Sequence, residues 1–172
     1  MTERLIINTF NIKSKKLLEI GCGAGRFTRV LGEKNKVFPT DIKKYELNDF
    51  VQASAFNLPF KEKSFDAVFG AFVLHHLIDL NKAVREIKKV LKTRGTYYGI
   101  EPNGLMFYFY ALIVRISGGS LNKDEKTIYS NQIKKIFSEN GFFVDINYIV
   151  PSIPEIKNKF FSTIMIIKAK RK

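Results

Sequence analysis

Three glycines and two carboxylates near the start of the chain have the types and the spacing to bind a nucleotide-like ligand. Gly21, Gly23 and Gly25 stand at alternate positions, just after an apolar run that contains Glu19. Glycine permits a tight turn and lets a ligand approach the bare backbone, and a helix that opens under such a turn offers unpaired N–H groups. Asp41 stands about 20 residues beyond the turn, the separation that places a carboxylate on the hydroxyls of a ribose. The alternative for Asp41 is the N-cap of a helix.

The elements that must hold these residues follow from the hydrophobic pattern. Residues 17–20 predict a buried parallel strand, and residues 24–32 predict a helix that ends at a glycine. Residues 36–41 predict a second strand, which Pro39 should shorten or bend. Arg26 occupies the position where a dinucleotide fingerprint has its third glycine, so a nicotinamide cofactor is disfavoured.

Further strands and helices follow along the chain. Asp79 should cap a helix over residues 80–91, and Ser130 should cap another that ends before residues 140–141. Residues 5–7 could form a strand or pack on the sheet. The remaining expected strands cover residues 50–53, 65–70, 96–100, 142–150 and 160–168. Because no helix separates the last two strands, they should pair antiparallel.

Composition limits the classes of protein. The 172 residues, 45% of them hydrophobic, suit one globular domain. The single cysteine, Cys22, excludes an internal disulfide and a cysteine metal cluster, fits a reducing cytoplasm and is expected to be a small turn residue. We see no signal peptide and no apolar run of the ~20 residues that span a bilayer. The net charge of +13 suits nucleic acid or an anionic membrane, but the lysines are scattered, which favours a solvated surface.

One apolar stretch, at residues 104–120, is not explained by these elements. It is dense in aromatic residues and is followed by a glycine-rich segment. Three interpretations stay open: a helix buried over the edge of the sheet, a lid or wall for an apolar substrate, and a shallow membrane contact.

Several motifs in this order resemble one family. The glycine turn with Glu19 before it resembles motif I of the class I S-adenosylmethionine-dependent methyltransferases. Residues 54–60, which end in Leu-Pro-Phe, and the Phe-Asp pair at 65–66 resemble the family's next segments. The adjacent pair His75 and His76 resembles its Leu-His-His segment. The chain is most similar to the group that includes the quinone-biosynthesis methyltransferases.

The resemblance implies a fold. It predicts a Rossmann-like, doubly wound α/β domain over residues 1–172, with a mostly parallel seven-stranded sheet of order 3-2-1-4-5-7-6 and a C-terminal antiparallel hairpin. Residues 104–120 would be an apolar insert or lid. The N-terminal cap of the family is reduced in this chain, so the pocket should be open, or covered by a partner or by Phe10.

The resemblance also implies an activity and a site. The chain would transfer a methyl group from S-adenosylmethionine to a small or apolar acceptor, leaving S-adenosylhomocysteine, with no metal. Candidates for a general base are His75, His76 and Glu101. Ser54 replaces the family's adenine-binding Asp. The predicted cofactor residues are Glu19, Gly21, Cys22, Gly23, Gly25, Asp41, Ile42, Ser54, Ala55, Phe56, Gly70 and Ala71.

Two alternatives keep the fold. An RNA methyltransferase would use the basic surface, and its affinity would fall steeply with salt. A non-catalytic partner subunit would keep the fold without turnover. The absence of an Asn-Pro-Pro-Tyr-like motif after the fourth strand disfavours methylation of a base or glutamine amino group. The sequence does not indicate the acceptor atom or the oligomeric state.

Overall fold

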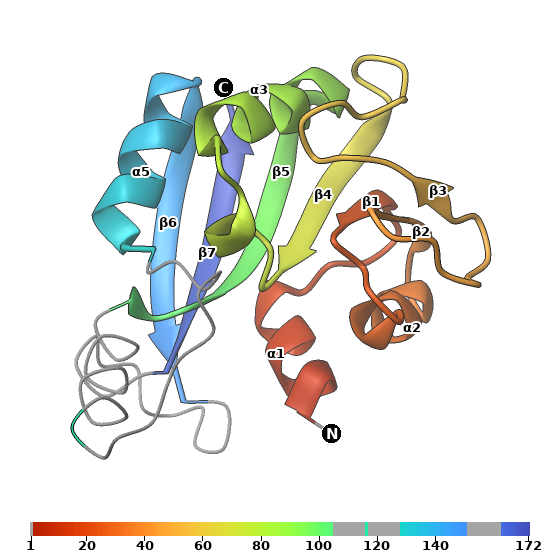
Figure 1. Ribbon diagram of the computed structural model, residues 1–172, viewed down its shortest axis with the longest axis horizontal. Helices are drawn as coiled ribbons and strands as arrows, with labels where there is room; N and C mark the ends of the chain where they lie inside the picture. The colour runs from red at the N-terminus through yellow and green to blue at the C-terminus, as the bar shows by residue number, and fades with distance from the viewer. Residues whose placement is uncertain (1, 105–115, 117–127, 151–162) are drawn as a thin grey trace.

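The computed structural model describes residues 2–104, 116, 128–150 and 163–172 of the chain (Figure 1). The helices are α1 (Thr2–Phe10), α2 (Arg26–Gly32), α3 (Leu80–Val90) and α5 (Ser130–Glu139), with a 3-10 turn, η1, at Leu74–His76. The strands are β1 (Lys16–Ile20), β2 (Lys36–Asp41), β3 (Val51–Gln52), β4 (Phe65–Ala71), β5 (Leu91–Pro102), β6 (Phe142–Ile149) and β7 (Ile164–Arg171).

The seven strands form one sheet in the order β3-β2-β1-β4-β5-β7-β6, which confirms the predicted order. Strands β1 to β5 pair in parallel with one another. Strand β7 runs antiparallel to both β5 and β6, which confirms the predicted C-terminal hairpin. Because β1 to β5 are parallel, their carboxyl ends meet along one edge of the sheet, which we call the carboxyl edge. Open α/β sheets bind their ligands at this edge.

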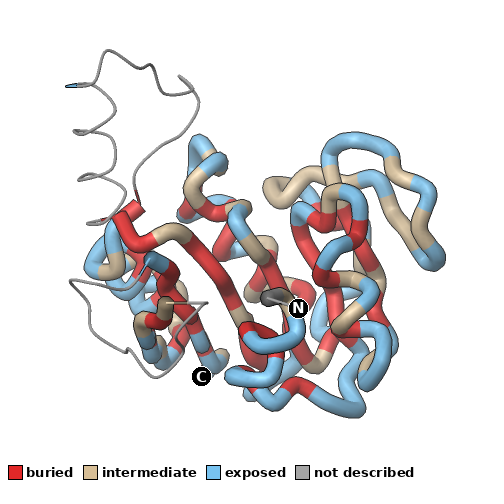
Figure 2. The backbone as a smooth tube through the Cα atoms, turned by 90° about the horizontal axis from the view of Figure 1, so that it is seen from below, coloured by how far each residue is buried: buried red, intermediate tan, exposed pale blue. Residues whose placement is uncertain are grey.

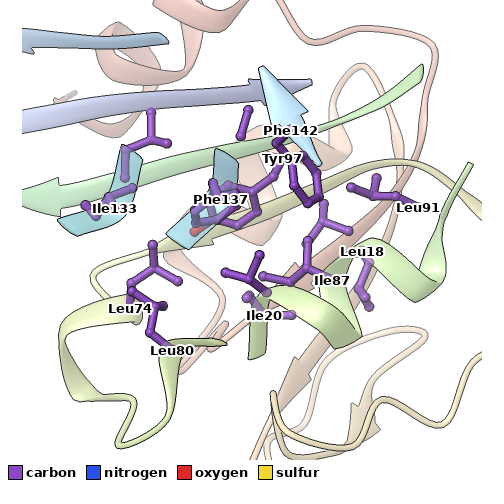
Figure 3. Close-up of a cluster of buried hydrophobic side chains, with 14 of the residues drawn as sticks. Leu18, Ile20, Leu74, Leu80, Ile87, Leu91, Tyr97, Ile133, Phe137 and Phe142 are labelled. Carbon is purple, nitrogen blue, oxygen red and sulfur yellow. The ribbon is translucent and has the colours of Figure 1, made fainter. Parts of the chain in front are cut away.

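Helices cover both faces of the sheet, so the doubly wound class is confirmed. Helices α3 and α5 cover one face, where Leu18, Tyr97 and Phe137 belong to a single buried cluster (Figure 3). Helices α1 and α2 cover the other face, over a second cluster that contains Leu17 and Phe69. Successive residues of β1 point to opposite faces and both are buried, which explains its continuous apolar run. Figure 2 shows the buried residues following the strands through the molecule.

The N-terminal residues form helix α1, so the strand considered for residues 5–7 is not present. Ile6 and Phe10, four positions apart on one helix face, are both buried. The ring of Phe10 packs against Phe69 at 6.2 Å and Tyr98 at 5.3 Å between centroids. Phe10 therefore belongs to the core, and the expectation that it covers the pocket is wrong.

Two other local predictions differ from the structure. Helix α5 begins at Ser130 with Tyr129 as its N-cap residue and without a side-chain cap bond, so the predicted Ser130 cap is wrong. Pro39 neither shortens nor bends β2 visibly, because β3 pairs only with Thr40 and Asp41 and requires no donor from Pro39. The predicted Asp79 cap of α3 is confirmed, since its side chain accepts from the Lys82 N–H.

The apolar stretch at residues 104–120 lies outside the described residues except at Gly104 and Ile116, so its three interpretations stay predictions. Within the described ranges, no helix has the length and apolar character to cross a bilayer.

Candidate functional site

A cavity of about 390 Å³ opens at the carboxyl edge, between the ends of β1, β2 and β3 on one side and the segment after β4 on the other. Its size falls in the range of small-molecule sites, which are roughly 300–1,000 Å³. It is lined by Ile20, Gly21, Thr40, Asp41, Ile42, Ala53, Ser54, Ala55, Phe56, Phe72, Val73, His76, Leu77 and Ile78.

The glycine turn after β1 requires glycine for its backbone conformation. Gly21, Gly23 and Gly25 have φ angles of +66°, +50° and +77°, in the region that side chains disfavour. A Cβ on Gly21 would lie 2.7 Å from Val73 Cγ2, so Gly21 packs directly against Val73. A Cβ on Gly23 would meet no atom within 4 Å, so the space beside Gly23 is open. At Gly23 the turn therefore presents bare backbone to open space, whereas Gly21 and Gly25 are packed against side chains.

Asp41 ends β2 and points toward the glycine turn. Its Oδ2 accepts from the Gly23 N–H at 2.9 Å, and its Oδ1 accepts from the Lys43 N–H at 3.0 Å. No helix follows Asp41 within the described residues 42–48, so it does not cap one. Each carboxylate oxygen keeps acceptor capacity for a further donor, since an ionised carboxylate offers about four acceptor sites.

Glu19 lies behind the turn and does not line the cavity. It is 2% exposed, and its Oε2 accepts a 2.6 Å hydrogen bond from the Thr28 hydroxyl. Burial raises the pKa of Glu19 to about 7, although the Thr28 bond lowers it in part. Burial, together with Glu19 and Asp41, raises the pKa of the Cys22 thiol to about 12, so this thiol is not poised as a nucleophile.

The segment after β3 forms a second wall of the cavity. Ser54 folds it into a tight turn, because its Oγ accepts from the Phe56 N–H at 3.2 Å and its carbonyl accepts from the Asn57 N–H at 3.0 Å. Ser54, Ala55 and Phe56 all line the cavity. The hydroxyl is thereby directed into the turn and not held by another side chain.

The segment after β4 forms the opposite wall, which is apolar except for His76. Phe72 has a φ angle of +55° and is 39% exposed, and Ile78 is 81% exposed. Neither residue was predicted. The signal available in the sequence was an apolar residue just beyond the carboxyl end of a predicted parallel strand, where the core of the sheet does not require one.

The three predicted base candidates occupy different positions. His76 lines the cavity. His75 does not, and its Nδ1 lies 2.6 Å from Oε2 of Glu101. Glu101, at the end of β5, is 0% exposed and also does not line the cavity.

Of the twelve predicted cofactor residues, six line the cavity and six do not. Gly21, Asp41, Ile42 and residues 54–56 line it. The other six lie behind its wall or at its margin. They are Glu19, Cys22, Gly23, Gly25, Gly70 and Ala71. Gly70 is packed so closely that a Cβ would lie 2.9 Å from Val73 Cγ1.

Comparisons with known proteins point to one family. A family model described as a methyltransferase domain matches residues 18–99. The chain is 27% identical over 173 residues to the ubiquinone/menaquinone biosynthesis C-methyltransferase UbiE of Haemophilus ducreyi, covering 79% of this chain and 67% of that protein. It is 25% identical over 186 residues to the demethylmenaquinone methyltransferase of Thermotoga maritima, covering 90% and 81%.

A solved structure shares the fold. It is an S-adenosylmethionine-dependent methyltransferase from Thermotoga maritima, described as a possible histamine N-methyltransferase. Its TM-score is 0.77 at 15% sequence identity, over 99% of this chain and 88% of that chain.

The chemistry of the cavity fits the cofactor that this family implies. S-adenosylmethionine carries a ribose diol, an adenine ring and an amino-acid tail. A carboxylate at the end of β2 suits the diol, apolar Ile42 and Phe56 suit a flat ring, and the open space beside Gly23 admits a ligand close to backbone. The matched domain, the relatives and the seven-stranded sheet together support a class I S-adenosylmethionine-dependent methyltransferase.

Proposed function

We propose that this enzyme methylates a small apolar acceptor, held against the Phe72–Ile78 wall, from S-adenosylmethionine held at the opposite wall. One observation carries this proposal: a single cavity joins the glycine turn and Asp41 to a wall that is apolar except for His76. The bound cofactor supplies an already activated methyl group, so the protein's work is to orient the acceptor and exclude water.

The proposal assigns the cofactor side as follows. Asp41 accepts from the ribose hydroxyls, because its carboxylate lies beside the open turn. Ile42 and residues 55–56 pack on the adenine, and the Ser54 hydroxyl accepts from its amino group. Glu19 and the residues behind the wall support the turn without touching the ligand.

The acceptor is proposed as neutral and apolar because the described residues of the acceptor wall include no Asp, Glu, Lys or Arg. Phe72, Leu77 and Ile78 give it a hydrophobic surface, and Asp41 is the one carboxylate among the cavity residues. A charged acceptor would be desolvated against Phe72 and Ile78 without a partner. The names of the two curated relatives make a reduced quinone ring the first acceptor to test.

His76 is the proposed general base if the acceptor must lose a proton. It is the one of the three candidates that lines the cavity. An imidazole facing the cavity is within reach of a proton on a bound acceptor, which is the geometry that a general base requires.

The distribution of basic residues supports a small molecule over RNA. Lys43 and Lys44 are exposed just after the cavity residues Asp41 and Ile42. Eleven other described basic residues, at the start of the parallel strands and the end of β7, are exposed at the edge opposite the cavity. They are Lys13, Lys15, Lys16, Lys34, Lys36, Lys61, Lys63, Lys92, Arg94, Lys170 and Lys172. A nucleic acid attracted to that edge would lie at the far ends of the strands from the cavity.

Two measurements test the proposal. Calorimetry with S-adenosylhomocysteine should give a saturable heat, and transfer of labelled methyl from S-adenosylmethionine to short-chain demethylmenaquinol should exceed transfer to an unstructured RNA. Saturable binding without transfer to any small acceptor would favour the non-catalytic partner subunit. Transfer to RNA that falls steeply with salt would favour the RNA enzyme.

The cytoplasmic location, suggested by the single cysteine, remains a sequence prediction. The same holds for the single-domain boundaries, for an open or partner-covered pocket and for peripheral membrane contact.

A further inference from the structure

A buried carboxylate fixes the apolar wall of the cavity. Glu101 is 0% exposed, and its Oε1 accepts from the backbone N–H groups of Val73 at 3.0 Å and Leu74 at 2.8 Å. Its Oε2 lies 2.6 Å from Nδ1 of His75. One side chain of β5 therefore bonds to three consecutive residues of the segment that follows β4.

Burying the Glu101 carboxylate carries a desolvation cost that its hydrogen-bond partners must offset. Moving a charged group out of water costs several kcal/mol unless hydrogen bonds replace those of the solvent. The hydrogen-bond partners of Glu101 among the described residues are Val73, Leu74 and His75, all in the segment that follows β4. The energetic reason for a buried acid at this position is therefore the conformation of that segment.

That conformation is strained at its first residue. Phe72 has a φ angle of +55°, which costs a residue with a side chain roughly 1–3 kcal/mol and persists only where its surroundings enforce it. The Phe72 N–H donates to the Ile100 carbonyl at 2.7 Å, and Glu101 binds the two N–H groups that follow. Ile100 and Glu101, adjacent on β5, thus bond to the backbone of the strained residue Phe72 and of the two residues after it. Phe72 lines the cavity.

The same contact fixes the orientation of His76. The rings of His75 and His76 lie 4.0 Å apart between centroids, tilted by 43°. The bond between His75 and Glu101 limits rotation of the first ring, and the first ring limits the second. His76 lines the cavity.

We propose that Glu101 is the positioning residue of methyl transfer: it holds Phe72 and His76 in the geometry that the acceptor meets. Glu101 touches neither ligand and acts through the 72–76 segment. The inference rests on the proposed function, which places the acceptor at this wall and the cofactor at the other.

The test compares Glu101→Ala and Glu101→Gln with the wild type. The matched control is Asp66→Asn, which alters a carboxylate that also accepts from a backbone N–H but lies at the opposite edge of the sheet. Loss of the Glu101 hydrogen bonds in Glu101→Ala should misplace Phe72 and His76 and so lower kcat with demethylmenaquinol by roughly 10- to 100-fold. The Kd for S-adenosylhomocysteine should change by less than about 3-fold. Glu101→Gln should restore part of the rate, because its amide oxygen still accepts from the two N–H groups.

Hydrogen exchange gives a readout that does not depend on turnover. Amides of residues 73–74 should exchange faster in Glu101→Ala than in the wild type, and the peptide with Asp41 should be unchanged. If Glu101→Ala does not fold, Glu101→Gln carries both comparisons with smaller expected effects, because a neutral amide oxygen accepts more weakly than a carboxylate. Unchanged exchange at 73–74, an unaltered kcat, or a parallel loss of cofactor-product affinity and kcat would overturn the inference. A wild type that binds no S-adenosylhomocysteine would instead refute the proposed function, and exchange would still decide whether Glu101 holds the segment.

Discussion

The backbone N–H of Gly23 donates a 2.9 Å hydrogen bond to Oδ2 of Asp41. This bond joins the turn after β1 to the end of β2, two elements whose contact the parallel pairing of these strands makes possible. It directs the carboxylate toward the open space beside the turn, where a ligand's hydroxyl groups would meet it.

Replacing Asp41 with asparagine should weaken the binding of S-adenosylhomocysteine. A hydrogen bond to a charged group contributes about 1.5–3 kcal/mol, so we expect a loss of roughly 10- to 100-fold in affinity, measured by calorimetry. The control is Asp145→Asn, at an exposed position of β6 where the carboxylate accepts from Asn147. Equal affinities of Asp41→Asn and the wild type would remove Asp41 from the site.

Gly23→Ala should fold but bind S-adenosylhomocysteine poorly. The new Cβ would meet no protein atom within 4 Å, so its cost to stability is the left-handed backbone, about 1–2 kcal/mol. The methyl group would project into the space where we expect the ligand. Urea unfolding and calorimetry measure the two effects separately.

Gly141→Ala is the matched control for Gly23→Ala. Gly141 also has a positive φ, +83°, and lies at the start of β6, away from the cavity. It should lose comparable stability and keep its affinity. If both variants keep their affinity, the space beside Gly23 does not receive the ligand.

Stability should fall between about pH 4.5 and 7 through Glu19. Burial raises its folded pKa from 4.5 to about 7, so in this window the folded state holds a proton that the unfolded state has released. The free energy of unfolding therefore decreases as pH rises, by up to roughly 3 kcal/mol from this group.

Glu19→Gln should abolish this contribution, because the amide oxygen still accepts from Thr28 and carries no charge. The free energy of unfolding of the variant minus that of the wild type should therefore be larger near pH 8 than near pH 5. Urea unfolding of both proteins at each pH measures this difference. A difference between the two proteins that does not change with pH would contradict the raised pKa.

At position 72, glycine should be more stable than alanine. Both substitutions remove the ring, but only alanine keeps a side chain at a φ of +55°. The free energy of unfolding of Phe72→Gly should therefore be about 1 kcal/mol higher than that of Phe72→Ala. Gly32→Ala provides the opposite case, since Gly32 ends α2 with ordinary φ and has open space around it. Alanine should be the more stable residue there, by about 0.5–1 kcal/mol. Thermal denaturation of the wild type, Phe72→Gly, Phe72→Ala and Gly32→Ala measures both differences. If alanine were more stable than glycine at position 72 as well, the strain at Phe72 would be contradicted.

Local patterns were enough for the elements whose signals lie within a few residues. The apolar run of β1, the turn at Gly21–Gly25 and the Asp79 cap of α3 were all predictable, because hydrophobic period, glycine spacing and capping are short-range effects. Residues 5–7 were ambiguous, because a short apolar run suits a strand or a helix and only packing against the sheet selects the helix.

The sequence by itself indicated the order of elements, the family resemblance and part of the cavity lining, namely Gly21, Asp41 and residues 54–56. The tertiary structure decided which of His75, His76 and Glu101 lines the cavity and which of them contact each other behind it. Glu101 follows His75 by 26 residues, and their contact exists only because β4 and β5 pair side by side. Burial and long-range hydrogen bonds depend on this pairing, so the sequence could nominate these three side chains but could not tell which one faces the cavity and which one holds the wall.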